Sequence, residues 1–168
     1  MASIRLAILT ISDGVAAGVR EDGSGDAIAA WSQLRGHAIV ARETVPDEAE
    51  RIASAIARLV DRQAAELVIT TGGTGFTARD VTPEATRAVL EREAPGIAEA
   101  IRLRGSISTP FSWLSRGVAG IRAGALIVNL PGGEGGVRDG LAVLDDVGRH
   151  AIQLLRGKDT ASHVIGDA

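Results

Sequence analysis

The sequence of 168 residues contains no cysteine and no tyrosine, and aromatic residues make up only 2% of it. Without cysteine, the chain cannot form disulfide bonds, zinc–thiolate sites or a cysteine nucleophile. The shortage of aromatic side chains leaves no platform on which nucleic-acid bases could stack. A formal net charge of −3 also disfavours a protein that binds nucleic acid by neutralising phosphates. We therefore expect no nucleic-acid partner.

Long apolar runs are missing as well. The N-terminal stretch MASIRLAILTIS is too short for a signal peptide, and no segment is long enough to cross a bilayer. We expect a cytoplasmic protein with no membrane partner, which agrees with the absence of disulfides. The length and the 45% hydrophobic content suit one globular domain over residues 1–157. Residues 158–168 are polar and aperiodic, and we interpret them as a C-terminal tail.

Segments typical of strands and helices alternate along the chain. Apolar runs at 6–11, 67–69 and 125–130 predict strands buried on both faces. Residues 37–45 predict a strand nearer an edge, and residues 118–122 a short edge strand. Helices are expected over 26–34, capped by Ser24, and over 46–60, 83–93, 96–104 and 137–155. This alternation indicates an α/β fold whose mainly parallel sheet has helices on both faces.

The stretch TTGGTGFTARDVTPEAT at 70–86 carries the strongest functional signal. It matches neither the P-loop pattern nor G-x-G-x-x-G. Three glycines among several threonines would let a backbone approach a ligand closely and offer N–H groups to anionic oxygens. Arg79 and Asp80 follow in the same loop, and Thr82 and Pro83 start a helix as N-cap and N1. We predict a phosphate and metal site at the carboxyl end of the sheet.

Asp47 has two interpretations. With Glu50 three residues later, it fits a capping box at the start of a helix. A carboxylate that follows a strand and precedes a helix also lies at the ligand-binding edge of an α/β sheet. We favour the functional role, which a cap would still allow. Asp80 has a structural alternative too, an ion pair with Arg79 that would brace the loop.

The chain resembles the MogA/MoaB family of molybdenum-cofactor biosynthesis proteins. GGTGFTARDVTPEAT carries the resemblance, and TISDGVAAGVREDGSGDAI, VPDE, TPFSWLSR and LIVNLPGG support it in the family's order over nearly the whole chain. The resemblance implies a three-layer α/β/α sandwich that is usually trimeric and binds molybdopterin. Active members transfer AMP from Mg-ATP to molybdopterin and release pyrophosphate, which prepares the pterin for metal insertion. A homotrimer and a downstream molybdenum insertase are therefore the expected partners.

The resemblance also suggests roles for individual residues. Asp47 and Asp80 would be catalytic and would hold Mg²⁺ between the phosphates of the substrates ATP and molybdopterin. The pterin or the phosphates would contact a larger group, which consists of Asp13, Ser24, Gly72, Gly73, Thr74, Gly75, Ser115, Arg116, Pro131 and Gly132. We interpret Phe111 and Trp113, which precede Ser115, as packing residues of the core or of a subunit interface.

One segment departs from the family pattern. Adenylylating members commonly carry proline and lysine just after Leu-Pro-Gly, whereas this chain has Gly-Glu-Gly-Gly at 133–136. Arg138 is the nearest cation that could replace the lysine. Because of this difference, the alternative function is a molybdopterin-binding protein of the same family that does not adenylylate.

Overall fold

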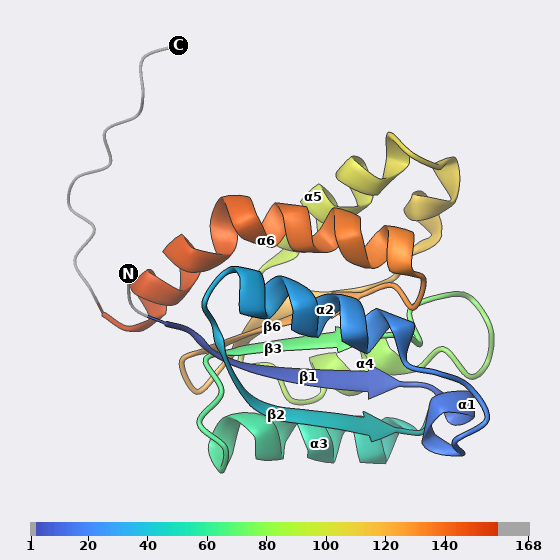
Figure 1. The fold of residues 1–168 in the computed structure, drawn as a ribbon, viewed down its shortest axis with the longest axis horizontal. Helices are drawn as coiled ribbons and strands as arrows, with labels where there is room; N and C mark the ends of the chain where they lie inside the picture. Colours follow the sequence, from blue (N-terminus) through green and yellow to red (C-terminus); the bar gives the residue numbers. More distant parts are fainter. Residues whose placement is uncertain (1–2, 158–168) are drawn as a thin grey trace.

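The computed structural model describes residues 3–157, and these form one six-stranded sheet with helices on both faces (Figure 1). The elements in chain order are β1 (Arg5–Ile11), α1 (Asp13–Ala16), α2 (Gly23–Leu34), β2 (Ala38–Val45), α3 (Ala49–Asp61), β3 (Leu67–Thr71), α4 (Thr82–Arg87), β4 (Arg92–Glu93), α5 (Pro95–Ser106), the 3₁₀ helix η1 (Pro110–Leu114), β5 (Ala119–Arg122), β6 (Ala125–Leu130) and α6 (Glu134–Leu155).

The strand order is β2-β1-β3-β6-β5-β4. The first four strands are parallel, while β5 runs antiparallel to both of its neighbours. The predicted mainly parallel sheet is therefore confirmed, and β2 lies at an edge as expected. Because β1, β3 and β6 run side by side in one direction, the segments that follow them emerge at the same edge of the sheet.

Each face of the sheet has its own hydrophobic core. Leu6, Ile8 and Ile69 point to the face covered by α2, α5 and α6. The alternating residues Leu9 and Val68 point to the face covered by α3 and α4 (Figure 1). The strands are apolar without interruption because both of their faces are buried, and each such side chain contributes about 1.5–3 kcal/mol. The three-layer α/β/α architecture is confirmed.

Several boundaries and caps differ from the predictions. The N-cap of α2 is Asp22, whose side chain accepts from the Gly25 N–H, so the helix begins before Ser24. Upstream of it, Ser12 caps the unpredicted short helix α1. Thr82 is not an N-cap, because Val81 occupies that position and the Thr82 hydroxyl donates to the Gly72 carbonyl instead. Thr82 has the residue type of an N-cap, but its hydroxyl bonds a carbonyl ten residues earlier in the chain.

The elements in the second half of the chain also differ from the predictions. The helix expected over 83–93 ends at Arg87, and Arg92–Glu93 forms the edge strand β4, so β5 is not the edge. Helix α6 starts at Glu134, three residues before the predicted start, and continues through Gly148. The predicted tail, 158–168, lies outside the described residues.

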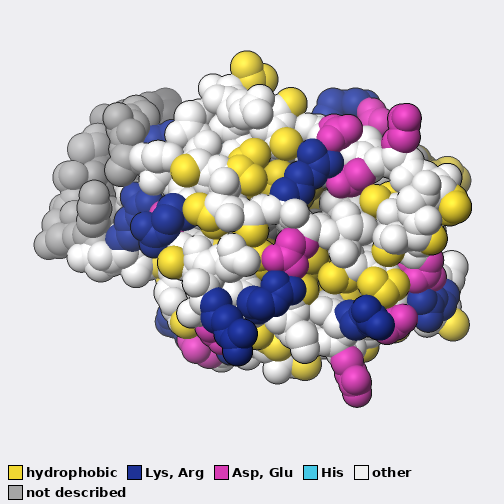
Figure 2. Space-filling model, turned by 60° about the horizontal axis from the view of Figure 1, so that its bottom comes forward, with side chains coloured by type: hydrophobic (Ala, Val, Ile, Leu, Met, Phe, Trp, Pro, Cys, Tyr) yellow, Lys and Arg dark blue, Asp and Glu magenta, His cyan; other side chains and the backbone are white. Residues whose placement is uncertain are grey.

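The surface mixes charges and exposes aromatic residues. Phe111 is 75% and Trp113 is 55% exposed, so the prediction that they pack in the core is wrong, and the subunit interface stays a prediction. Figure 2 shows basic and acidic side chains lying next to one another over one face. Among residues 3–157, none of the helices has the length and apolar character that a membrane crossing requires.

Candidate active site

Two glycine loops touch at the carboxyl end of the sheet, one after β3 and one after β6. The Gly72 N–H donates to the Leu130 carbonyl at 3.2 Å, and the Thr71 hydroxyl donates to the Pro131 carbonyl at 2.8 Å. A Cβ on Gly132 would lie 3.3 Å from the Gly72 Cα, so the two backbones are in close contact there. These contacts join the loops into one wall.

The first loop needs glycine at two adjacent positions. Gly72 and Gly73 have φ angles of +99° and +63°, which L side chains rarely adopt. A Cβ on Gly72 would lie 2.2 Å from the Ile11 carbonyl oxygen, and one on Gly73 would lie 2.3 Å from the Thr82 hydroxyl. Thr82 is buried, and its hydroxyl and N–H bond the carbonyls of Gly72 and Gly73. The helix that follows the loop therefore holds it from behind.

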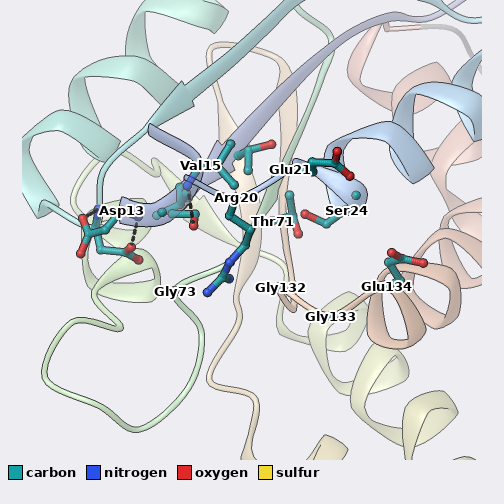
Figure 3. A pocket seen from close by; sticks show the side chains of 17 residues that line it. Asp13, Val15, Arg20, Glu21, Ser24, Thr71, Gly73, Gly132, Gly133 and Glu134 are labelled. Atoms are coloured by element: carbon teal, nitrogen blue, oxygen red, sulfur yellow. Dashed lines mark hydrogen bonds between the residues drawn. The ribbon is translucent and has the colours of Figure 1, made fainter. Parts of the chain in front are cut away.

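A first cavity of about 520 Å³ opens on one side of this wall, between the loop after β1 and the start of α2 (Figure 3). Its lining is largely polar. In Figure 3 the Arg20 side chain extends across the cavity toward the Gly73 loop, and Ser24 and Glu134 lie at the opposite end from Asp13. No ion pair or hydrogen bond of the Arg20 guanidinium occurs within the described residues. This cation is available to an anionic ligand.

Asp13 and Asp47 are tied together at the edge of the first cavity. The Asp13 N–H donates to Asp47 Oδ2 at 2.9 Å, and the Asp47 N–H donates to Asp13 Oδ1 at 3.0 Å. The predicted capping box is wrong, because α3 begins after Glu48 with no side-chain cap. Asp47 instead links the end of β1 to the turn after β2, with its carboxylate at the cavity.

Arg79 completes this cluster. It donates to both carboxylate oxygens of Asp13, at 2.8 and 2.9 Å from Nη2. Hydrogen bonds from Arg79 and from the Asp47 backbone hold the pKa of Asp13 below its usual value. The alternative in which Arg79 pairs with Asp80 is wrong, since the guanidinium turns to an acid 66 residues away in sequence. The loop after β3 is thereby fastened to the end of β1.

A second cavity of about 580 Å³ opens on the other side of the glycine wall. It lies between the first loop, the η1 segment and the first turns of α6. Phe111, Leu114 and Pro131 give it an apolar part, and Ser108, Thr109, Ser112 and Ser115 supply hydroxyl groups. The two cavities share Gly73, Gly132 and Gly133 as lining residues. A ligand in either cavity would therefore contact the same glycine backbone.

Asp80 belongs to the second cavity. One of its oxygens, Oδ2, accepts from the Thr77 N–H at 2.8 Å and from the Thr77 hydroxyl at 2.6 Å. Burial raises the pKa of Asp80, but the hydrogen bonds from Thr77 and Gly75 outweigh it, so the pKa is lowered overall. Asp80 is consequently a carboxylate at neutral pH.

Arg116 lies behind the loop. Its Nε donates to the Gly75 carbonyl at 2.7 Å, while its terminal nitrogens bond the Asp80 carbonyl and the Glu84 carboxylate. Arg116 lines neither of the two cavities, whereas its neighbour Ser115 lines the second. These contacts give Arg116 a bracing role, and the contact with substrate suggested by the resemblance stays a prediction.

The structure divides the predicted site residues between the two cavities. Asp13, Ser24, Asp47 and Gly72 line the first; Thr74, Gly75, Asp80, Ser115 and Pro131 line the second; Gly73 and Gly132 line both. Cavity-lining residues that were not predicted from the sequence include Arg20 and Glu134 in the first cavity and Phe111 in the second. Arg20 lies in the long loop after β1, and Glu134 comes directly after the second glycine loop. Their positions in or next to these loops are the sequence feature that could have pointed to them.

The acidic side chains of the site decide whether it could hold a magnesium ion. Within residues 3–157, no three His, Cys, Asp or Glu side chains converge as a metal-binding group. Asp47 and Asp80 both contact the glycine loop, because a Cβ on Gly73 would lie 3.1 Å from Asp47 Oδ1 and one on Gly75 3.0 Å from Asp80 Oδ2. Mg²⁺ is usually held by one or two carboxylates together with substrate phosphates. The two carboxylates line different cavities, and either of them fits an ion that arrives with a phosphate substrate.

Comparison with known proteins defines the class of protein. Residues 7–150 match the family described as "Probable molybdopterin binding domain". The chain is 38% identical over 181 residues to the Molybdopterin adenylyltransferase of Escherichia coli (strain K12), covering 98% of this chain and 93% of that protein. It superposes on the Molybdopterin biosynthesis enzyme MoaB from Thermus thermophilus with a TM-score of 0.85 and 45% identity, over 92% and 98% of the two chains. The chain therefore belongs to the molybdopterin-binding domain family.

Other relatives are much longer. The chain is 39% identical over 159 residues to the Molybdenum cofactor synthesis protein cinnamon of Drosophila melanogaster. The aligned region covers 92% of this chain. It spans only 26% of the length of cinnamon, and half or less of other relatives of this kind. The domain thus occurs both alone and as part of larger proteins.

Proposed function

We propose that the protein is a molybdopterin adenylyltransferase, which transfers AMP from ATP to the terminal phosphate of molybdopterin. The observation that carries this proposal is the pair of cavities that meet at one glycine wall. Two substrates with ring systems at one end and phosphates at the other can occupy neighbouring cavities with their phosphates side by side. Such positioning supplies most of the catalysis in phosphoryl transfer.

In the proposed reaction, an oxygen of the molybdopterin phosphate attacks the α-phosphorus of ATP. A new phosphorus–oxygen bond forms, the bond from the α-phosphorus to the oxygen that bridges to the β-phosphate breaks, and pyrophosphate leaves with that oxygen. The protein needs no nucleophile of its own for this step. Its part is to align the two phosphates and to balance their charge.

The residues of the shared wall have distinct tasks in this proposal. The backbone N–H groups of Gly73 and Thr74 bind phosphate oxygens, as consecutive amides in a tight loop can. Asp47 and Asp80 would hold Mg²⁺ at the wall, where the ion would neutralise phosphate charge. Arg20 lies on the first-cavity side and attracts an anionic group there. The polar groups at 108, 109, 112 and 115 orient a ring in the second cavity.

The proposal extends to the assembly and the pathway. Phe111, Trp113 and Leu114 are all about half exposed or more, and such a group of large apolar side chains is typical of an interface. We propose a homotrimer in which a neighbouring subunit covers them. A molybdenum insertase that accepts the adenylylated pterin, and the cytoplasmic location expected from the sequence, are parts of the same proposal.

A direct experiment is to mix the purified protein with molybdopterin, ATP and Mg²⁺ and to analyse the pterin by mass spectrometry. We expect a mass gain of one adenylyl group, together with release of pyrophosphate. A sample without Mg²⁺ and a sample with a non-hydrolysable α,β-methylene ATP analogue are the controls. If molybdopterin binds tightly but no adenylylated product forms, the adenylyltransferase proposal is wrong.

The segment at 133–136 favours a second candidate, a molybdopterin-binding protein that does not adenylylate. These residues, Gly-Glu-Gly-Gly, bring no cation to the wall that both cavities share. A protein of this kind would bind molybdopterin with the same affinity whether or not ATP is present. Measuring pterin binding with and without Mg-ATP in the same experiment separates the two functions.

A further inference from the structure

The second cavity has, in its described lining, few charged residues, and only one of them is basic. Among its described lining residues, the charged side chains are Asp80, Asp139 and Arg138. Two carboxylates alone would repel a phosphate, and at short range this repulsion is strong in a partly enclosed site. Arg138 is therefore the side chain on which the affinity of this cavity for an anion depends.

Two other arginines near this cavity are not available to a ligand. Arg116 uses its guanidinium to bond the carbonyls of Gly75 and Asp80 and a carboxylate. Arg102 donates to the carbonyls of Ser115 and Gly117 at 3.2 and 2.9 Å. Both hold the cavity wall in shape from outside. Arg138, in contrast, is part of the lining itself.

Arg138 is only loosely held. Within residues 3–157, its one ion pair is with Glu134, one turn earlier on α6, at 3.9 Å, and its side chain is 70% exposed. Such a pair on a helix surface contributes little to stability. Glu134 itself lines the first cavity, whereas Arg138 lines the second. A phosphate in the second cavity can therefore replace Glu134 as the partner of Arg138 at little cost.

Two glycines, Gly135 and Gly136, stand between Glu134 and Arg138 on the first turn of α6. A Cβ on Gly135 would lie 3.9 Å from Arg138 Nη2, and a Cβ on Gly136 would lie 2.8 Å from the Pro131 side chain. A side chain at 136 would therefore meet Pro131 of the second glycine loop, whereas one at 135 would make only an ordinary contact with Arg138. The Arg138 side chain lines the same cavity as Gly132 and Gly133.

We propose that Arg138 binds a phosphate group of a substrate in the second cavity and is a specificity-determining residue of the reaction. The planar guanidinium can pair two of its N–H groups with two phosphate oxygens. The phosphate comes from one of two sources, the triphosphate of ATP or the phosphate of molybdopterin. The inference rests on the proposed function, since it takes these two molecules as the ligands.

The test compares Arg138→Gln and Arg138→Lys with Arg62→Gln, a matched loss of charge at an exposed residue that lines none of the cavities described above. Calorimetry measures the binding of Mg-ATP and of molybdopterin separately, in each variant and in the unchanged protein. We expect Arg138→Gln to weaken one of the two ligands about tenfold, as for loss of a charge-assisted hydrogen bond. Arg138→Lys should recover part of that loss.

The outcomes distinguish the sources. Weaker Mg-ATP binding with unchanged molybdopterin binding assigns the phosphate to the nucleotide, and the reverse result assigns it to the pterin. If Arg138→Gln binds both ligands as well as Arg62→Gln does, the inference is wrong. The binding measurements do not require catalytic turnover. A protein that binds both ligands but forms no product would therefore contradict the proposed function without contradicting the role of Arg138.

Discussion

The two cavities differ in how their charged groups are held. In the first, Asp13, Asp47 and Arg79 bond one another and connect three separate segments of the chain. In the second, the Asp80 carboxylate is bonded only within its own loop, and Arg138 has, within residues 3–157, one long ion pair. In the described part of the chain, the first cavity thus has a preformed polar edge at Asp13, with the Arg20 side chain free beside it, while the second has no such edge and a single cation that can change partners.

This difference indicates that the two cavities suit different kinds of ligand group. A preformed edge suits the binding of one fixed group, because little conformational entropy is lost when the ligand arrives. A loosely held cation suits a phosphate that enters, reacts and leaves. The glycine wall serves both, and its geometry is the feature on which the comparison depends most.

The largest effect is expected from Gly72→Ala in that wall. A Cβ there meets the Ile11 carbonyl oxygen at 2.2 Å in a backbone with φ +99°, so we expect a loss of about 3 kcal/mol in the free energy of unfolding. Urea unfolding followed by circular dichroism measures it. The control is Gly36→Ala, with φ +68° and no atom within 4 Å, which should cost only about 1 kcal/mol. Equal losses in both variants would contradict the close contact.

A comparison of Asp80→Asn with Asp47→Asn tests whether both cavities contribute an acid to the reaction. Each amide keeps the shape and a hydrogen-bond acceptor but removes the negative charge. We expect each change to lower kcat by about 100-fold or more with the fold retained, as for loss of a major electrostatic contact. The double variant should be little worse, because groups that act as a unit are not additive.

The same assay decides between the two acids. Asp146→Asn, on the exposed side of α6, is the control and should keep full activity. Full activity in Asp80→Asn would exclude a metal role for that residue. A loss confined to one variant would assign the ion to a single cavity and leave the other acid as a structural residue.

Much of the fold could be predicted from local patterns. The strand Ala125–Leu130 matches its prediction residue for residue, since an uninterrupted apolar run has few alternatives once both faces are buried. The glycine loop after β3 was also predicted, because its glycines, threonines and charged pair exceed what a turn requires. Local sequence was sufficient to predict those elements whose conformation is set by residues adjacent in the chain.

The contacts of the site could not be predicted in the same way. Asp47 looked like a helix cap, yet its partner is Asp13, 34 residues earlier. Arg79 stands beside Asp80, yet it pairs with Asp13, 66 residues away. Side chains adjacent in sequence need not face each other in a loop, and the loop's path depends on Gly72 and on its contact with β1. These partners follow from the tertiary structure alone.

A smaller effect is expected at the opposite edge of the sheet, which has no part in either cavity. Glu66, just before β3, accepts from Arg156 at 2.6 and 2.7 Å and from the Arg5 N–H at 3.0 Å. Arg156 is the main cause that lowers the pKa of Glu66 from 4.5 to about 2. A lowered pKa in the folded state stabilises above pH 4.5, and this contribution is lost as the pH falls toward about 2.

Glu66→Gln should therefore remove about 2 kcal/mol of stability at pH 7. The difference from the unchanged protein should shrink as the pH is lowered from 4.5 toward 2. Thermal unfolding over this pH range measures both quantities. Adenylyl transfer at pH 7 should be unchanged, because Glu66 lines neither cavity. A clear loss of activity would show that the two edges of the sheet are coupled.

The smallest effect is expected from Arg116→Gln, which sharpens the comparison between fixed and loosely held groups. Arg116 fixes the loop at Gly75 and Asp80 through carbonyl contacts that glutamine cannot reproduce together. Loss of this brace should displace Asp80 and lower kcat about tenfold, with a loss of about 1 kcal/mol in stability.

The control Arg122→Gln breaks a comparable pair with Asp61 away from both cavities. If Arg116 positions the loop, kcat falls while KM changes little, and the control loses stability alone. If Arg116 instead contacts a substrate phosphate, KM rises more than kcat falls, and the brace is not its main role.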